Sequence, residues 1–568
     1  MHLKKTKQKN GRVYLSIVEG YYDPVKKYSR ANTIKKIGYL DDLEKEYPDP
    51  IAHFTETVNK MNEKKLEDKL CKTIVISGTE RVEGNQRKNF GYAALSAVYH
   101  ELEIDRFFAN RQQSLGSKYN INAIIRLLIF SRILNPGSKK KAFDEKERFF
   151  ERSDFTITDM YRCLSRFALF KEDLQLWIHE RITANYERDT SITYYDVTNY
   201  YFEIDEQDDL RKKGVSKEHR PDPIIQMGLL MDNNGLPMAY DLFPGNQNDC
   251  VTLLPVIKRI RKQFNTGKLV VVSDKGLNTQ KNAYYLANRR GGYVFSQSVR
   301  GGNKELKDYI LVQDGYEWIG DNFKKKSRQF TRKIEFEDDG GSMVNAEIAE
   351  KQVVFYSREY DLKSKADREN VIRKAYGIIA NPKNFNKKNS FGAAKYIRQI
   401  EYDKKTGEII AANSVLAFNH EMLAEEEKYD GFYVIVTNAY NKPDDWVIDT
   451  YKGLWRIEET FKVTKSDLEA RPAFVSREDR IQAHFLICFV SLVIIRLLQR
   501  KLNDELSSTK IINSLSKACC SLVKDNFYLF DYEDDTLNRI GKLFDIDFTL
   551  KFRTQAEIKN ILAKVKLF

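Results

Sequence analysis

The sequence lacks the features that identify secreted, disulfide-linked and zinc-binding proteins. Its six cysteines are scattered without any C-x-x-C pair, and its seven histidines show no zinc-ligand spacing. The opening residues, MHLKKTKQKNGR, are polar throughout and do not resemble a signal peptide. The strongest apolar run, residues 485–498, is short for a membrane span and contains Arg496, so we expect a buried helix and no membrane partner. These absences favour a cytoplasmic protein with reduced thiols.

The charge balance is basic. The 568 residues include 94 Lys and Arg against 81 Asp and Glu, which gives a formal net charge of +13. A positive balance suits a protein that binds the phosphate backbone of nucleic acid, although a solvated lysine-rich surface has the same composition. The chain is long enough for several domains with sizeable cores.

Hydrophobic periodicity and turn signals predict an α/β protein built from six segments. We expect a small β-containing unit (1–80), a helical domain (88–190), the first part of an α/β core (191–300), a β-rich insertion (301–430), the second part of the core (431–500) and a helical C-terminal region (501–568).

The core has a characteristic order of elements. Three strand-like runs lie within residues 191–245, the last two joined by the turn Asn233-Asn234-Gly235, and a helix, a strand, a helix and a strand follow. This is the order of a ribonuclease H-like fold, in which the first and fourth strands lie side by side. Asp249 precedes the first of these helices in an N-cap setting.

Three carboxylates stand in settings that suit metal-ion catalysis. Asp196 lies inside the first strand, Asp274 ends the fourth strand, and Glu458 lies in a helix that Pro443 opens. Such a set can hold two Mg²⁺ or Mn²⁺ ions, which clamp the attacking and leaving oxygens of a phosphoryl displacement. Each residue also has an ordinary alternative, because strand ends and helix surfaces commonly carry acids.

Helix geometry places further groups beside Glu458. At about 100° per residue, one face would present Tyr451, Leu454, Glu458, Lys462 and Lys465. This face combines an aromatic ring, a carboxylate and two ammonium groups. The alternative is a surface helix supported by the Glu458–Lys462 pair.

This stretch resembles the Y-x2-R-x3-E-x6-K signature of the DDE transposases of bacterial insertion sequences. The signature is that of insertion-sequence family four and its close relatives. Tyr451, Glu458 and Lys465 match the signature, and Leu454 stands at the arginine position. The runs YYDVTNYYFE and VVSDKGL are similar to the two aspartate blocks of these enzymes. The resemblance spans roughly residues 190–490.

The resemblance implies that Asp196, Asp274 and Glu458 are catalytic and hold two Mg²⁺ ions, with Mn²⁺ as a substitute. It also implies a set of DNA contacts, for which the candidates are Tyr451, Lys462, Lys465, Lys275, His219, Arg220 and Trp318. For Arg220 the alternative is a salt bridge with Asp222. For Trp318 the alternatives are a platform for a flipped base and a position in the core.

The expected function is that of a cut-and-paste DNA transposase in a bacterial cytoplasm, associated with the nucleoid. It would bind double-stranded DNA at terminal inverted repeats, pair two ends as a homodimer and transfer them to target DNA. Residues 1–80 and 88–190 would contact the DNA ends, and residues 501–568 would serve dimerisation. The alternatives are a transposase-derived DNA-binding protein without catalysis and a ribonuclease H-like nuclease.

Overall fold

The computed structural model describes residues 1–23, 28–70, 87–112, 116–218, 220–264, 266–288, 291–381, 392–401 and 414–568. The chain forms two compact units. The smaller unit comprises Met1–Glu83 and Val523–Asp525, and the larger one comprises Gly84–Leu522 and Asn526–Phe568.

The smaller unit is an antiparallel sheet with helices. Its strands lie in the order β1-β2-β3, with β1 at His2–Lys7, β2 at Val13–Asp23 and β3 at Tyr28–Tyr39. The short helix α1 (Leu40–Leu43) and the long helix α2 (Pro50–Leu70) follow. The strands agree with the expected β-containing unit, to which the structure adds the long helix α2.

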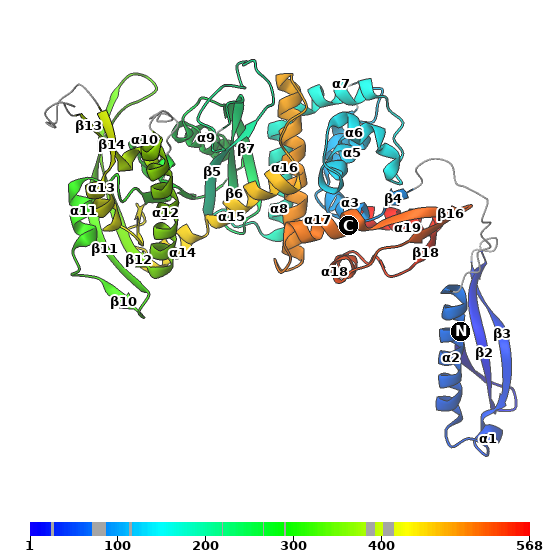
Figure 1. The fold of residues 1–568 in the computed structure, drawn as a ribbon. Coiled ribbons are helices and arrows are strands. Elements are labelled where there is room, and N and C mark those ends of the chain that lie inside the picture. Colours follow the sequence, from blue (N-terminus) through cyan, green and yellow to red (C-terminus); the bar gives the residue numbers. More distant parts are fainter. Residues whose placement is uncertain are drawn as a thin grey trace. The chain divides into compact units, whose positions relative to one another are not determined.

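The larger unit is built on a mixed sheet of nine described strands, in the order β10-β11-β12-β15-β9-β8-β5-β6-β7 (Figure 1). Strands β5 (Ile192–Tyr201), β6 (Ile224–Asp232) and β7 (Pro237–Pro244) form an antiparallel meander. Strand β8 (Val270–Ser273) pairs in parallel with β5, and β9 (Gly292–Gln297) pairs in parallel with β8. The expected adjacency of the first and fourth core strands is therefore confirmed.

The two faces of this sheet pack against different helices. On one face, Tyr195 and Val197 of β5 share a core with α9 (Leu253–Gln263) and α10 (Gln280–Asn288). On the other face, Tyr194 and Tyr200 belong to the core that contains α16 (Glu478–Lys501). Because side chains alternate along a strand, Asp196 lies on the same face as Tyr194.

Helix α16 is long and apolar enough to cross a membrane by length and composition, and 94% of its most apolar window is buried inside the protein. The expected buried helix at 485–498 is thus confirmed. It shares a core with the helices of the N-terminal helical segment, which are α3 (Tyr92–Glu101), α4 (Ile104–Gln112), α5 (Ile121–Leu134), α6 (Lys139–Asp144), α7 (Ile157–Ala168) and α8 (Lys171–Tyr186).

The C-terminal region differs from the expected all-helical segment. It contains α17 (Ser508–Lys517), α18 (Asp535–Leu543) and α19 (Gln555–Lys564), but also β16 (Cys519–Lys524), β17 (Phe527–Phe530) and β18 (Phe552–Thr554). These strands join β4 (Arg87–Asn89) in the order β18-β17-β16-β4. The strands β16 and β17 are separated by Asp525 and Asn526, and the φ of 50° at Asp525 is the left-handed backbone that tight hairpin turns require.

The expected β-rich insertion extends the central sheet. Its long strands β11 (Phe323–Glu337) and β12 (Met343–Ser357) pair with each other, and β12 also pairs with β15 (Phe432–Thr437) of the core. The other elements are α11 (Lys304–Leu311), β10 (Glu317–Ile319), α12 (Arg358–Ala380), β13 (Ile397–Glu401), β14 (Ser414–Phe418) and α13 (His420–Glu427). The insertion also contains helices, and α11 buries Leu306 and Ile310 at helical spacing.

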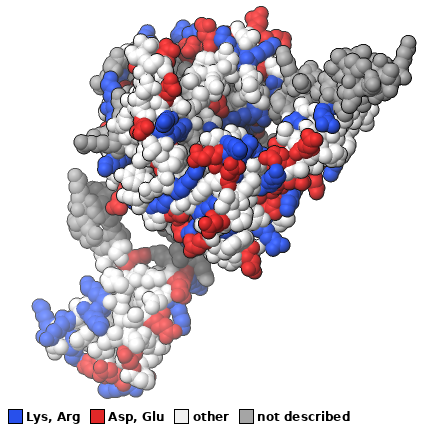
Figure 2. Space-filling view, turned by 90° about the vertical axis from the view of Figure 1, so that its left-hand side faces the viewer, with Lys and Arg blue, Asp and Glu red and all other residues white. Residues whose placement is uncertain are grey.

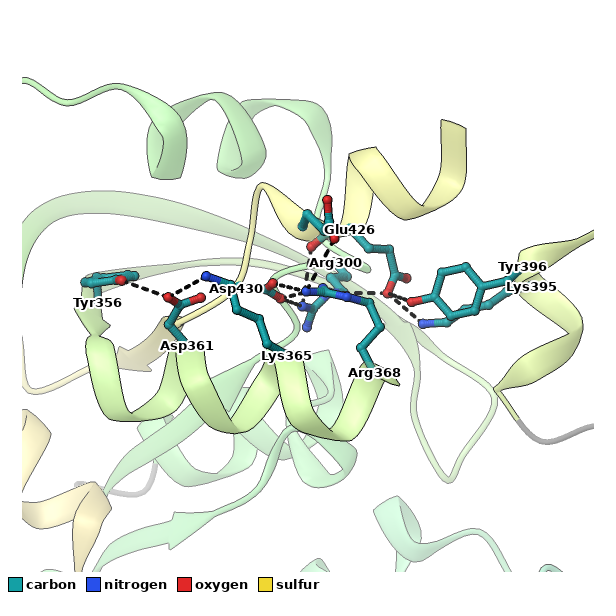
Figure 3. Close-up of polar contacts among 10 residues, drawn as sticks. Arg300, Tyr356, Asp361, Lys365, Arg368, Lys395, Tyr396, Glu426 and Asp430 are labelled. Atoms are coloured by element: carbon teal, nitrogen blue, oxygen red, sulfur yellow. Dashed lines mark hydrogen bonds and ion pairs between the residues drawn. The ribbon is translucent and has the colours of Figure 1, made fainter. Parts of the chain in front are cut away.

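Ion pairs fasten α12 to the segment that returns to the core (Figure 3). Arg368 of α12 makes a two-pronged contact with the carboxylate of Asp430, and both side chains are buried. Arg300 adds a hydrogen bond to Asp430 at 2.8 Å. Nearby, Glu426 accepts hydrogen bonds from Lys395 and Tyr396 at 2.7 and 3.0 Å.

Candidate active site

Two aspartates lie close together where β8 ends beside β5. In the register of β5 and β8, Tyr194 stands opposite Val272. Two residues further along each chain, this register places Asp196 beside Asp274, at the strand separation of about 5 Å. Both aspartates are partly buried.

Hydroxyl groups from two other elements hold Asp274. The Ser296 hydroxyl of β9 donates to Asp274 Oδ1 at 2.7 Å. The Tyr451 hydroxyl, at the end of α14 (Asp444–Lys452), lies 3.5 Å from the same oxygen and 2.9 Å from the Tyr433 hydroxyl. Tyr451 is thus in contact with a predicted catalytic carboxylate, and burial raises the pKa of its phenol above the ordinary range.

A concentration of negative charge surrounds Asp196. Burial, together with the charges of Asp274 and Asp249, raises the pKa of Asp196 to about 6, while the ammonium of Lys217 acts in the opposite direction. Burial also raises the pKa of Asp249. The expectation that Asp249 is an N-cap is wrong, since Asn248 caps the short turn Asp249–Val251 and α9 begins only after Thr252.

The two aspartates fit a divalent cation, because a cation would stabilise the ionised carboxylate of Asp196, which burial and, to a smaller extent, the charges of Asp274 and Asp249 disfavour. Glu458 is not part of this arrangement: its side chain is exposed, and no contact joins it to either aspartate among the described residues. In that described part of the chain, no three His, Cys, Asp or Glu residues are grouped so as to hold a metal ion.

The helix expected to carry Glu458 is divided. Helix α14 ends at Lys452, α15 spans Trp455–Lys462, and a π-helical turn follows at Val463–Asp467. At the break, a Cβ on Gly453 would lie 2.1 Å from the Tyr194 hydroxyl, so the strand tyrosine occupies the space beside the glycine.

The residues of the predicted common face differ in burial. Leu454 is buried, Tyr451 is partly buried, and Glu458 and Lys462 are exposed. Lys465 lies in the π-helical turn, where burial lowers the pKa of its ammonium to about 8. Arg456 is directed to the β6–β7 turn and donates to the Asn233 carbonyl oxygen at 3.1 Å.

The remaining predicted contacts lie in different settings. Lys275 is exposed beside Asp274, and His219 lies outside the described residues. Arg220 lies 3.8 Å from Asp222, as the alternative interpretation predicted, and 4.0 Å above the Tyr201 ring. Trp318 is 55% exposed in β10, so the core alternative is wrong.

A group of charged residues lies next to Asp196 without any local signal in the sequence. Lys217 donates to the Val197 carbonyl oxygen, and Glu218 forms ion pairs with Lys465 and Arg471. These residues come from a mixed-charge loop and from a segment after the signature, so only the fold brings them together. On the face drawn in Figure 2, basic and acidic side chains are intermingled, so net charge alone does not locate a binding surface.

A family model described as a transposase DDE domain matches residues 207–494, just over half of the chain. The chain belongs to the DDE transposases. A second model, the N-terminal domain of IS1634 family transposases, matches residues 3–72. These two matches confirm the resemblance to the DDE transposases of bacterial insertion sequences. The DDE match includes Asp274 and Glu458 and begins after Asp196.

No curated protein matches the transposase in sequence. Among solved structures, the cryo-EM structure of the piggyBac transposase synaptic complex with hairpin DNA is similar over 84% of this chain and 84% of that chain. The TM-score is 0.32 and the sequence identity is 8%.

Proposed function

We propose that this transposase binds the terminal inverted repeats of an insertion sequence, cleaves DNA at the element ends and transfers the strands into target DNA. The observation that carries the proposal is the parallel pairing of β5 with β8, which brings Asp274, the residue after β8, near Asp196 of β5 in a chain that belongs to the DDE transposases. The strand order of a ribonuclease H-like core, extended by the insertion, supports the same assignment.

The proposed metal ligands are Asp196, Asp274 and Glu458, with Mg²⁺ as the natural ion and Mn²⁺ as a substitute. Bound ions would stabilise the attacking and leaving oxygens of the phosphoryl transfer. Glu458 lies on the exposed side of α15, so we propose that it joins the two aspartates once DNA is bound.

The chain's own residues orient these groups. Ser296 and Tyr451 fix the carboxylate of Asp274 by hydrogen bonds, and they leave its second oxygen available to a cation. Lys217 and Lys465 place positive charge beside Asp196, where a phosphodiester would approach. The exposed side chains of Lys275, Lys462 and Trp318 are further candidates for DNA contacts.

Recognition of the ends is assigned to residues 1–80 and 88–190, because the central sheet carries the chemistry. We further propose that two copies pair the two ends as a homodimer and that the reaction takes place at the nucleoid in a bacterial cytoplasm.

The test uses linear DNA that spans the flanks of the gene, with Mg²⁺ or Mn²⁺ and a plasmid target. Wild type is compared with Asp196→Asn, Asp274→Asn and Glu458→Gln, and Glu469→Gln is the matched control, since Glu469 is an exposed acid close to the signature. We expect end cleavage and joining with the wild type and the control, and neither with the three variants.

Other outcomes would replace the proposal. Binding of the ends without cleavage by the wild type would favour a transposase-derived DNA-binding protein. Cleavage without joining would favour a nuclease. Cleavage that survives Asp196→Asn or Glu458→Gln would show that other carboxylates hold the metal ions.

A further inference from the structure

Two cations from the segment after the catalytic helix converge on one carboxylate. Lys465 Nζ lies 3.3 Å from Glu218 Oε1, and the Arg471 guanidinium forms an ion pair with the same oxygen. The three side chains retain 15%, 22% and 30% exposure for Lys465, Arg471 and Glu218 respectively, so the cluster opens to solvent.

This cluster adjoins the proposed catalytic centre. Lys217 precedes Glu218 and donates to the Val197 carbonyl oxygen, one residue beyond Asp196 in β5. The charges of Lys217 and Asp196 both act on Lys465, which places the three groups in one electrostatic neighbourhood. A ligand seated on Lys465 and Arg471 would therefore lie beside the phosphodiester undergoing cleavage.

A third cation, Arg220, lies close to the cluster. Besides Lys465, the guanidinium groups of Arg220 and Arg471 lie 4.0 and 5.4 Å from the Tyr201 ring centroid. Of these cations, Lys465 and Arg471 have Glu218 as their anionic partner, and Arg220 has Asp222. A carboxylate and a phosphodiester offer the same acceptor chemistry, and a guanidinium fork fits both.

We propose that Lys465 and Arg471 form a binding site for a DNA phosphate and that Glu218 occupies this site in the free protein. DNA binding displaces the Glu218 carboxylate, and the two cations transfer to the phosphate. Displacement costs little, because partly exposed ion pairs are weak and the glutamate side chain has rotamers that leave the site. This inference rests on the proposed function, and it adds Arg471 as a DNA contact and Glu218 as an internal competitor of DNA.

The alternative is that Glu218 serves only to fasten its loop to the segment around Arg471. Under that alternative, removal of its charge loosens the protein and leaves DNA affinity unchanged or weaker. Under the proposal, the same change strengthens DNA binding. The two interpretations therefore predict different changes in the affinity for DNA.

The test measures binding of the full-length protein to a fluorescent duplex of its own terminal repeat, by anisotropy over a range of salt concentrations. We expect Glu218→Gln to bind DNA about threefold to fivefold more tightly than the wild type. This change in affinity corresponds to the free energy of one partly exposed ion pair that no longer competes with DNA. Glu206→Gln removes the same charge from an exposed position in the same loop and measures the effect of net charge alone.

Arg471→Gln is expected to weaken binding and to reduce the slope of log affinity against log salt by about one. In the double variant Glu218→Gln/Arg471→Gln, the gain from Glu218→Gln should be largely lost, because the phosphate site is incomplete. Thermal melting of each variant, with and without inorganic phosphate, checks folding and gives a second readout, in which phosphate stabilises Glu218→Gln more than the wild type.

Specific results would overturn the inference. Glu218→Gln that binds no more tightly than Glu206→Gln, or a salt slope that Arg471→Gln leaves unchanged, would return Glu218 to a structural role. If Glu218→Gln does not fold, the salt slope of Arg471→Gln decides alone. A wild type that does not bind the terminal repeat would instead refute the proposed function.

Discussion

Replacing Asp196 by Asn should stabilise the protein while abolishing its activity. Burial and the neighbouring carboxylates raise the pKa of Asp196 from its ordinary value of 3.8 to about 6. The charged form of Asp196 is therefore disfavoured in the folded state, and a neutral amide of similar shape removes this penalty. The difference of about 2.2 pKa units corresponds to about 3 kcal/mol in the free energy of unfolding at pH 8.

The sign of the pH dependence follows from the direction of the shift. Because the folded state holds the proton of Asp196 more tightly than the unfolded state, wild-type stability falls as the pH rises from about 4 to about 6. The advantage of Asp196→Asn grows with pH, from about 2 kcal/mol at pH 5 to about 3 kcal/mol at pH 8. Asp205→Asn, at an exposed site in the following loop, should show no such change.

The assay is thermal unfolding of the three proteins at pH 5 and pH 8, in which 3 kcal/mol corresponds to roughly 3 °C for a unit of this size. Mg²⁺ should stabilise the wild type more than Asp196→Asn, because a bound cation favours the ionised carboxylate that only the wild type has at position 196. The reasoning is refuted if Asp196→Asn melts below the wild type at pH 8, or if the difference between them is the same at both pH values.

Three other changes test separate parts of the structure. Arg368→Ala leaves a buried carboxylate with fewer partners and should cost about 3–5 kcal/mol in thermal unfolding, whereas Lys365→Ala, which removes an exposed lysine from its pair with Asp361, should cost much less. Gly453→Ala places a methyl group against the Tyr194 hydroxyl, so it should cost about 1–3 kcal/mol and reduce DNA cleavage more than DNA binding. Because the pKa of Lys465 is about 8, DNA affinity should fall between pH 7 and pH 9, and Lys465→Arg should flatten that dependence in anisotropy titrations at constant ionic strength.

Each of these expectations has a contrary result. Equal melting temperatures for Arg368→Ala and Lys365→Ala would mean that the buried pair adds nothing beyond an exposed one. Wild-type cleavage by Gly453→Ala would mean that the break between α14 and α15 does not position the catalytic helix. An unchanged affinity between pH 7 and pH 9 would assign phosphate binding to cations other than Lys465.

The core could be predicted from the sequence because its signals are local. The apolar strands that contain Asp196 and precede Asp274 are bounded by turn residues, and the meander after Asp196 has a clear Asn-Gly turn. The order of elements then fixed which strands are neighbours, so the pairing of β5 with β8 followed.

The charged cluster around Glu218 could not be predicted in this way. Glu218 lies in a loop of mixed charge, and Arg471 lies beyond the signature, so nothing in their local sequence distinguishes them from surface residues. The local sequence of Asp249 predicts an N-cap. Its proximity to Asp196 depends instead on the packing of the turns that follow β7 and β8, which the local sequence does not show.

The division of the helix at Gly453 coincides with a long-range contact that helical periodicity does not predict. Periodicity assumed that Tyr451 and Lys465 belong to one uninterrupted helix, which would place both on the face of Glu458. Instead, the Tyr194 side chain of β5 occupies the space that a Cβ at Gly453 would need. Tyr194 lies two residues before Asp196 and on the same face of the sheet, so the strand that supplies one acid also contacts the junction between α14 and the helix carrying Glu458. We therefore expect a larger residue at 453 to displace either the Tyr194 side chain or the junction between α14 and α15.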